Sequence, residues 1–220
     1  MEKYLNQFCE KLKELAGNNL ISVILYGSFA RGENVEGHSD VNLMLVTESL
    51  HLNQLTFLEK EIHHLQKKIN LNIVFWTKEE LESSIDVFPI EFLEISEHHK
   101  TLYGEHLLKE ISVDTKNFRH QLEFELRSKL LKLRSAWLEG KESKKMLFKT
   151  ITRAGTSFFH LYNQAKKLSN ENFSDELAGP FRKSLQLKKK EIALNQKELQ
   201  DLYCAIYESA VKMVKLVNCL

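Results

Sequence analysis

The sequence predicts an α+β fold, in which a mixed β-sheet with flanking helices is followed by an all-helical bundle. Short apolar runs bounded by turn residues, typical of strands, occur in the first half of the 220 residues. After Asp114 these runs stop, and apolar residues recur only at helical spacing. The charge also changes there, since residues 1–115 carry a net −9 and residues 116–220 a net +10. We therefore expect two domains, at residues 1–112 and 113–220.

Helices and strands alternate in the expected first domain. A helix over residues 2–16 has apolar positions at steps of three or four and ends before Gly17. The apolar patterns predict strands at residues 19–27, 40–46 and 69–77, and helices at residues 52–68 and 78–85. In the third strand, Ile73 and Phe75 face one side of the sheet, whereas Asn70, Asn72 and Trp76 face the other. Pro89 predicts a bend at the start of residues 90–104, to which no strand is assigned.

The second half is predicted to be a bundle of four or five helices. Helices are expected at residues 115–140, 142–168, 181–187 and 196–217. The first of them has one apolar stripe, which contains Leu122, Leu126, Leu130, Leu133 and Trp137. Residues 169–180 are expected to form a loop. Short connections between long helices favour antiparallel neighbours, and hence a bundle.

Composition excludes several classes of protein. Apolar runs fall well short of the roughly 20 residues that a membrane span needs, so we expect no membrane association. The first 17 residues are amphipathic rather than typical of a signal peptide, which predicts a cytoplasmic protein. The three cysteines, Cys9, Cys204 and Cys219, have no CxxC spacing and are expected to be free thiols.

A Gly-Ser turn follows the first predicted strand. Gly27 ends the strand, and Ser28 begins what is expected to be a short helix. Glycine lets a ligand approach the backbone, and the serine hydroxyl can donate to a phosphate oxygen. Arg31 lies one helical turn further on and can add positive charge. The turn is therefore a candidate nucleotide-binding site, although a plain strand-to-helix turn would have the same two residues.

Asp40 and Asn42 follow on the next predicted strand. They are two residues apart, so both side chains point to the same side of the sheet. A carboxylate pair at this spacing can bridge two Mg²⁺ ions. The segment GSFARGENVEGHSDVN, at residues 27–42, resembles the nucleotidyltransferase superfamily of DNA polymerase beta-like and kanamycin nucleotidyltransferase-like proteins. The pattern of that superfamily is Gly-Ser, about a dozen residues, Asp-x-Asp, and a third carboxylate on a later strand.

The resemblance implies a function and also a departure from it. It implies transfer of a nucleoside monophosphate from a nucleoside triphosphate such as ATP to a hydroxyl acceptor, with Mg²⁺ held at Asp40 and at the positions of Asn42 and Asn72. Here both of these positions are Asn, so one carboxylate of three remains. The alternative is a catalytically inactive nucleotide-binding or regulatory module, as in the antitoxins of the superfamily. Glu33, Glu36 and His38 could replace the missing ligands, or lie in solvent.

The partners of the basic second half remain open. Its cations can form a solvated surface, attract the acidic half, or bind a polyanion such as nucleic acid, for which the motifs are weak. Arg119, Glu123 and Arg127 share a helix face, either as ion pairs or as a triphosphate contact. The small residues at 154–157 allow close helix packing or leave room for a ligand. A regulatory module would present the bundle to a second copy of the chain or to a helical partner protein.

Overall fold

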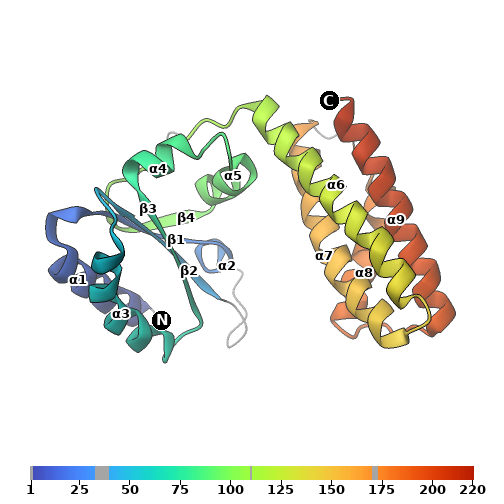
Figure 1. Ribbon diagram of the computed structural model, residues 1–220, viewed down its shortest axis with the longest axis horizontal. Coiled ribbons are helices and arrows are strands. Elements are labelled where there is room, and N and C mark those ends of the chain that lie inside the picture. Colours follow the sequence, from blue (N-terminus) through green and yellow to red (C-terminus); the bar gives the residue numbers. More distant parts are fainter. Residues whose placement is uncertain (1, 33–39, 110, 170–172) are drawn as a thin grey trace. The chain divides into compact units, whose positions relative to one another are not determined.

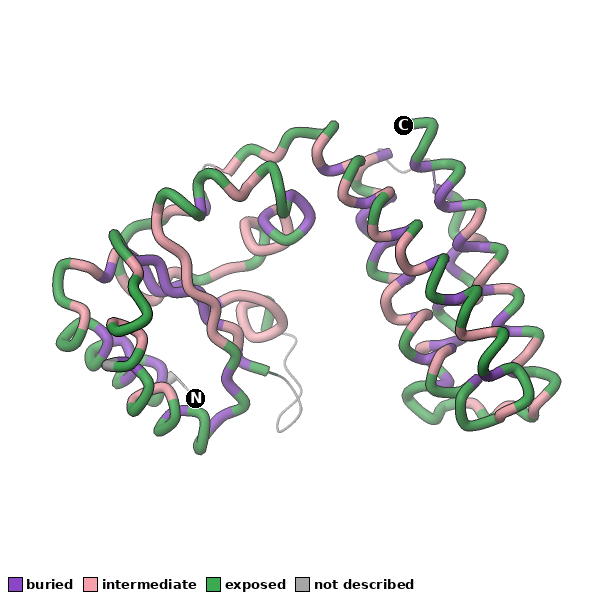
Figure 2. Tube along the Cα trace, in the orientation of Figure 1, coloured by how far each residue is buried: buried purple, intermediate pink, exposed green. Residues whose placement is uncertain are grey.

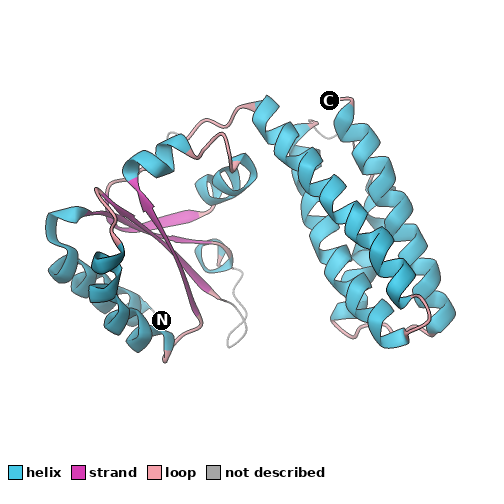
Figure 3. Cartoon of the chain, in the orientation of Figure 1, coloured by secondary structure: helices cyan, strands magenta, loops and turns pink. Residues whose placement is uncertain are grey.

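The computed structural model describes residues 2–32, 40–109, 111–169 and 173–220. Its backbone divides into two compact units, Met1–Asp114 and Thr115–Leu220, which are described separately here. The first unit contains a four-stranded sheet with helices, and the second is helical (Figures 1 and 3). The predicted α+β fold class is confirmed. The predicted domain boundary lies two residues before the division between the units, and whether each unit folds alone stays a prediction.

The first unit contains helices and strands in the predicted order up to Ser83, whereas no element was assigned to residues 90–104 from the sequence. Its elements are α1 (Glu2–Ala16), η1 (Gly17–Asn19), β1 (Leu20–Tyr26), α2 (Ser28–Arg31), β2 (Val41–Thr47), α3 (Leu52–Gln66), β3 (Leu71–Thr77), α4 (Lys78–Ser83), α5 (Pro89–Glu97) and β4 (His99–Gly104). α1 ends at the residue before Gly17, which takes a positive φ of 54°. α4 begins with a capping box, in which Thr77 and Glu80 bond each other's backbone N–H groups.

The four strands form a mixed sheet in the order β3-β2-β1-β4. β1 pairs antiparallel with both β2 and β4, whereas β2 and β3 are parallel. A parallel pair needs a long crossover, and α3 provides it.

Side chains of the strands alternate between two buried layers. One layer joins Leu25, Leu43 and Leu45 to α1 and α3, and the other joins Ile24, Met44 and Val46 to α4 and α5. Figure 2 shows this burial along the central strands. The sheet therefore has helices on both faces. By strand alternation, Asn42 and Asn72 belong to the face that α4 and α5 cover.

β4 was not predicted from the sequence. His99–Gly104 has an irregular burial pattern, without the alternation that identifies a half-buried strand. Its pairing with β1 holds it in the sheet, and one register shift occurs between Val23 and Ile24. Gly104 is in close contact there, since a Cβ at this residue would lie 1.8 Å from the carbonyl oxygen of Ile21. Long-range pairing, rather than local sequence, makes this segment a strand.

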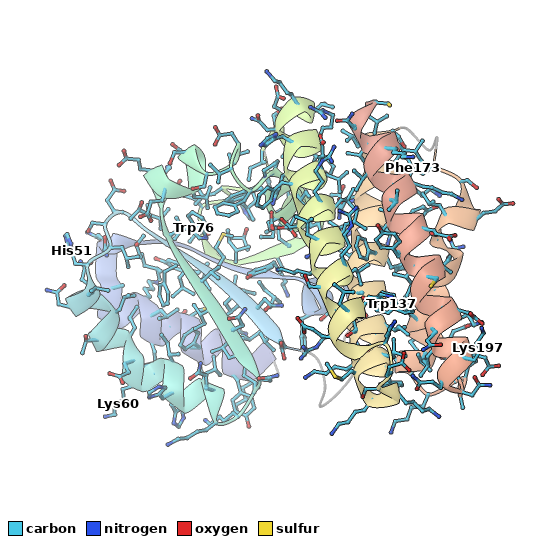
Figure 4. All side chains as sticks on the ribbon, turned by 45° about the vertical axis from the view of Figure 1, so that its right-hand side comes forward. His51, Lys60, Trp76, Trp137, Phe173 and Lys197 are labelled. Carbon is cyan, nitrogen blue, oxygen red and sulfur yellow. The ribbon has the colours of Figure 1, made fainter. Side chains whose placement is uncertain are left out.

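The second unit is a bundle of four helices with one short 3₁₀ turn among its described residues. Its elements are α6 (Thr115–Gly140), α7 (Lys144–Leu168), η2 (Asp175–Ala178), α8 (Gly179–Lys188) and α9 (Gln196–Asn218). The stripe predicted on α6 is buried at its four leucines. Trp137 packs against Tyr203 of α9, with ring centroids 5.0 Å apart (Trp137 is labelled in Figure 4). Among the described helices, none combines the length and hydropathy that a membrane crossing requires.

Candidate functional site

The Gly-Ser turn connects the end of β1 to the short helix α2. Gly27 has φ 79° and ψ −152°, in a region that residues with a Cβ rarely adopt. A Cβ at Gly27 would also lie 2.9 Å from Nδ2 of Asn42. The N–H of Arg31 donates to the carbonyl of Gly27 at 3.1 Å, which closes the turn. Backbone conformation and space therefore both favour glycine at this position.

Asp40 and three asparagines form two side-chain pairs where β2 and β3 begin. Asn42 lies opposite Tyr26 on β1 and opposite Asn72 on β3. The Asn72 amide donates to Oδ1 of Asn42 at 3.3 Å. The amide of Asn70, which lies just before β3, donates to Oδ1 of Asp40. Asn42 and Asn72 therefore meet in space, and Oδ1 of Asp40 and Oδ1 of Asn42 each accept a hydrogen bond from an asparagine amide.

A pocket of about 390 Å³ opens beside these side chains. The turn, the start of β2 and one face of α5 line it, through Tyr26, Gly27, Ser28, Arg31, Asp40, Asn42, Glu91, Glu94 and Ile95. Five of the six residues predicted for the site are among them. The sixth, Asn72, reaches the pocket only through its hydrogen bond to Asn42.

The sequence did not predict that residues of α5 line the pocket. Trp76 on β3 packs against Phe88 and Phe92, with ring centroids 6.2 and 5.9 Å away, and so fixes α5 against the sheet (Trp76 is labelled in Figure 4). This packing places Glu91 and Glu94 at the pocket. The two glutamates lie three residues apart on a helix, a spacing that identifies a shared face but not what the face meets.

Tyr26 gives the pocket a neutral hydroxyl. Burial raises the pKa of the Tyr26 phenol above its ordinary value, because the charged phenolate would lose hydration. The side chain therefore keeps its proton at neutral pH. It can donate one hydrogen bond and accept others from a ligand in the pocket.

The ligand set does not fit a two-metal magnesium site. Such a site needs carboxylates that both ions can share, and Asp40 is the one acid present at the three predicted positions. Nowhere in the described ranges do three His, Cys, Asp or Glu side chains gather closely enough to hold a metal ion. Asn42 and Asn72 are joined by a hydrogen bond instead. Glu33, Glu36 and His38, for which both a ligand role and a solvated position were considered, lie outside the described residues.

The arginines considered on α6 are ion-paired. Glu123 lies 2.9 Å from Nη1 of Arg119 and 2.7 Å from Nη2 of Arg127. These contacts lower the pKa of the Glu123 carboxyl, chiefly through its hydrogen bond with Arg127. The ion-pair interpretation of this helix face is therefore confirmed.

The first unit also matches a known family. Residues 2–99 fit the family model described as "Nucleotidyltransferase domain". This unit is a nucleotidyltransferase domain. The match includes the Gly-Ser turn, Asp40, Asn42 and Asn72, so the resemblance predicted from the sequence is confirmed.

One curated protein resembles a short part of the chain in sequence, and one solved structure resembles nearly the whole chain in fold. The "putative protein adenylyltransferase MJ1305" of Methanocaldococcus jannaschii is 44% identical over 50 residues, which are 23% of this chain and 33% of that protein. The chain thus matches about a third of the length of this curated relative. A crystal structure of spectinomycin adenyltransferase AAD(9) from Enterococcus faecialis, with ATP and spectinomycin, has a TM-score of 0.57 at 10% identity.

The two structural matches differ in what they support. The adenyltransferase match covers 96% of this chain and 99% of that chain, so the succession of sheet domain and helical bundle is a shared fold. A toxin-antitoxin crystal structure with AMP-PNP is 18% identical over 46% of this chain and 74% of that chain. Its TM-score of 0.33 carries no argument about this protein.

Proposed function

We propose that the nucleotidyltransferase domain binds a nucleoside triphosphate at the Gly-Ser turn and does not transfer its nucleotidyl group. The hydrogen bond between Asn42 and Asn72 carries this proposal. Where the resemblance implies two negatively charged carboxylates, this chain has a neutral pair joined by one hydrogen bond. The protein would then be a nucleotide-binding or regulatory module with the fold of an enzyme.

The turn supplies groups that suit phosphate oxygens. The Ser28 hydroxyl can donate a hydrogen bond, and the Arg31 guanidinium lies in the same pocket. Gly27 leaves the backbone open to a close approach. The names of the Methanocaldococcus jannaschii relative and of the solved adenyltransferase favour ATP as the nucleotide.

The amide pair weakens metal binding for an electrostatic reason. An Asn oxygen can ligate Mg²⁺, but it brings no negative charge to offset the dehydration of the ion. Three carboxylates in one place would repel one another without a metal, and Asn removes that repulsion. We therefore expect ATP to bind with an affinity that Mg²⁺ changes little.

Nucleotidyl transfer is the second candidate function. It is favoured by Glu91 and Glu94, which bring two further carboxylates to the pocket that contains Asp40. In this case the chain would transfer a nucleoside monophosphate to a hydroxyl acceptor and release pyrophosphate. The acceptor would be a small molecule, an RNA end or a protein side chain.

One double substitution tests the loss of metal chemistry. Asn42→Asp with Asn72→Asp restores the two carboxylates, and we expect Mg²⁺ to raise the melting temperature of this variant but not of the native protein. Pyrophosphate release from ATP is expected from the double variant and not from the native chain. Asn53→Asp with Asn163→Asp adds the same charge at two exposed positions and serves as the matched control.

The same assay separates the two candidate functions. Pyrophosphate release by the native protein that stops in Asp40→Ala would refute the inactive-module proposal and establish the second candidate. Calorimetry with ATP adds a direct measure of binding. Ser28→Ala together with Arg31→Gln should weaken ATP binding at least about tenfold if the turn holds the phosphates.

The partners and location of the protein remain proposals. A regulatory module needs a partner that reads its nucleotide state, and the bundle could present a surface to a second copy of the chain or to a helical protein. Cytoplasmic localisation also stays a prediction. Gel filtration of the native chain with and without ATP would detect a nucleotide-dependent change of oligomeric state.

A further inference from the structure

A second pocket lies within the helical bundle, between α6 and α7. Its volume is about 520 Å³. Four cationic side chains line it, Lys129 and Lys132 from α6 and Lys149 and Arg153 from α7, together with one carboxylate, Glu139. The second unit as a whole carries 21 Lys and Arg against 11 Asp and Glu. The groove therefore concentrates positive charge in a concave site of the basic half.

Within the described part of the chain, three of the four cations have no acidic partner. Lys129 forms an ion pair with Glu125 at 2.9 Å. Lys132, Lys149 and Arg153 make no ion pair with any residue that the structure describes. Lys129 and Lys132 are three residues apart and Lys149 and Arg153 four, so each pair repels across one helical turn. A bound anion would relieve this repulsion on both helices at once.

The rest of the lining is apolar or carries hydroxyl groups. Leu133 and Phe158 are buried beneath the groove, and Ala136 and Ala154 contribute small side chains. Thr150 and Ser157 add two hydroxyls. The small residues leave room between the helices, and the hydroxyls can donate to anionic oxygens. Two members of the small-residue run at 154–157 therefore line a cavity rather than a tight helix contact.

We propose that this groove binds a polyphosphate group, either inorganic or as part of a nucleoside triphosphate. Several charges gathered around one cavity suit a compact anion with charge on successive phosphates. Single-stranded nucleic acid, by contrast, is usually held by exposed aromatic side chains on which the bases stack. Phe158 is the single aromatic residue lining the groove, and it is completely buried.

This inference does not depend on the function proposed for the first unit. All the residues of the groove lie in the second unit, and they are distinct from those at the Gly-Ser turn. Ser28→Ala with Arg31→Gln reports on the turn, whereas substitutions on α6 and α7 report on the groove. Failure at one site is therefore distinguishable from failure at the other.

Calorimetry of the full chain with sodium tripolyphosphate tests the groove. We expect saturable binding in the native protein and at least about tenfold weaker binding in Lys132→Gln with Arg153→Gln, because two charged contacts are lost. Lys183→Gln with Lys197→Gln removes the same charge at exposed bundle positions outside the groove and should change the affinity less than about twofold (Lys197 is labelled in Figure 4). Lys149→Gln provides an independent second variant.

The arms of the experiment distinguish the two sources of polyphosphate. If ATP fills a site that is lost in Lys132→Gln with Arg153→Gln but kept in Ser28→Ala with Arg31→Gln, the ligand is a nucleotide. If tripolyphosphate fills such a site and ATP does not, the ligand is inorganic polyphosphate. Absence of saturable tripolyphosphate binding overturns the proposal. Equal weakening by the groove and control variants, or displacement of tripolyphosphate by a short RNA at much lower concentration, overturns it as well.

Discussion

At the scale of single residues, the site depends on where short polar side chains lie on the strands. The spacing of two between Asp40 and Asn42 placed both on one side of the sheet, and Asn72 took the same side by its own alternation. Strand alternation alone does not predict which side chain each of these residues bonds to. Asn42 bonds to Asn72, and Asp40 bonds to Asn70, because the parallel register of β2 and β3 brings these pairs together.

The three thiols are expected to differ in reactivity. Cys9 is buried, and burial, followed by the charge of Glu10, raises the pKa of its thiol to about 11. Cys204 and Cys219 are exposed. An aromatic disulfide reagent at pH 8 should therefore titrate two thiols rapidly in the native protein and the third only after unfolding. Cys9→Ser should leave the rapid phase unchanged, and rapid reaction of all three thiols would contradict the buried position of Cys9.

At the scale of elements, local periodicity identified the long helices and three of the four strands. α6 follows the predicted leucine stripe, and Gly140 ends it as expected. β4 was not predicted because its side chains do not alternate clearly between buried and exposed positions. Tertiary pairing with β1 gives this segment its conformation, so no window of its own sequence contains the signal.

The contact between α7 and α8 depends on Gly155. A Cβ at this position would lie 1.5 Å from Oγ and 2.3 Å from Cβ of Ser184, which is itself buried. We expect Gly155→Ala to lower the free energy of unfolding by about 1–3 kcal/mol, because the helices must move apart. Urea denaturation followed by circular dichroism measures this change.

Two further variants make this test specific. Gly155→Ala with Ser184→Gly removes the obstructing side chain, so the double variant should recover part of the lost stability. Gly179→Ala adds a methyl group where no atom lies within 4 Å of the new Cβ, and its effect should stay within about 0.5 kcal/mol. Equal losses for Gly155→Ala and Gly179→Ala would show that the α7–α8 contact is not the cause.

At the scale of the whole molecule, charge and secondary structure change at the same point of the chain. The acidic residues belong mainly to the sheet unit and the basic ones to the bundle. Buried side chains within the sheet unit form clusters on both faces of the sheet, and the bundle buries the inner stripes of its own helices. Each unit thus has a hydrophobic core made from its own residues.

Separate production of residues 1–114 and 115–220 tests whether the units are domains. We expect both fragments to unfold cooperatively, since each has its own core, and the second to be almost entirely helical by circular dichroism. Their net charges of −9 and +10 should send them to opposite ion exchangers at pH 7. A fragment that is soluble but lacks a cooperative transition would show that its core needs the other unit.

The sequence by itself determined the class of fold, the turn at Gly27, the side of the sheet that carries Asp40, Asn42 and Asn72, and the buried stripe of α6. These features follow from covalent neighbours, because strand alternation, helical spacing and backbone conformation act over a few residues. Only the tertiary structure decided the pairing of β4, the arrival of Glu91 and Glu94 at the pocket, and the gathering of cations between α6 and α7. Each of these features depends on contacts between segments that are distant in sequence. The packing of apolar side chains, such as Trp76 against Phe92, brings such segments together.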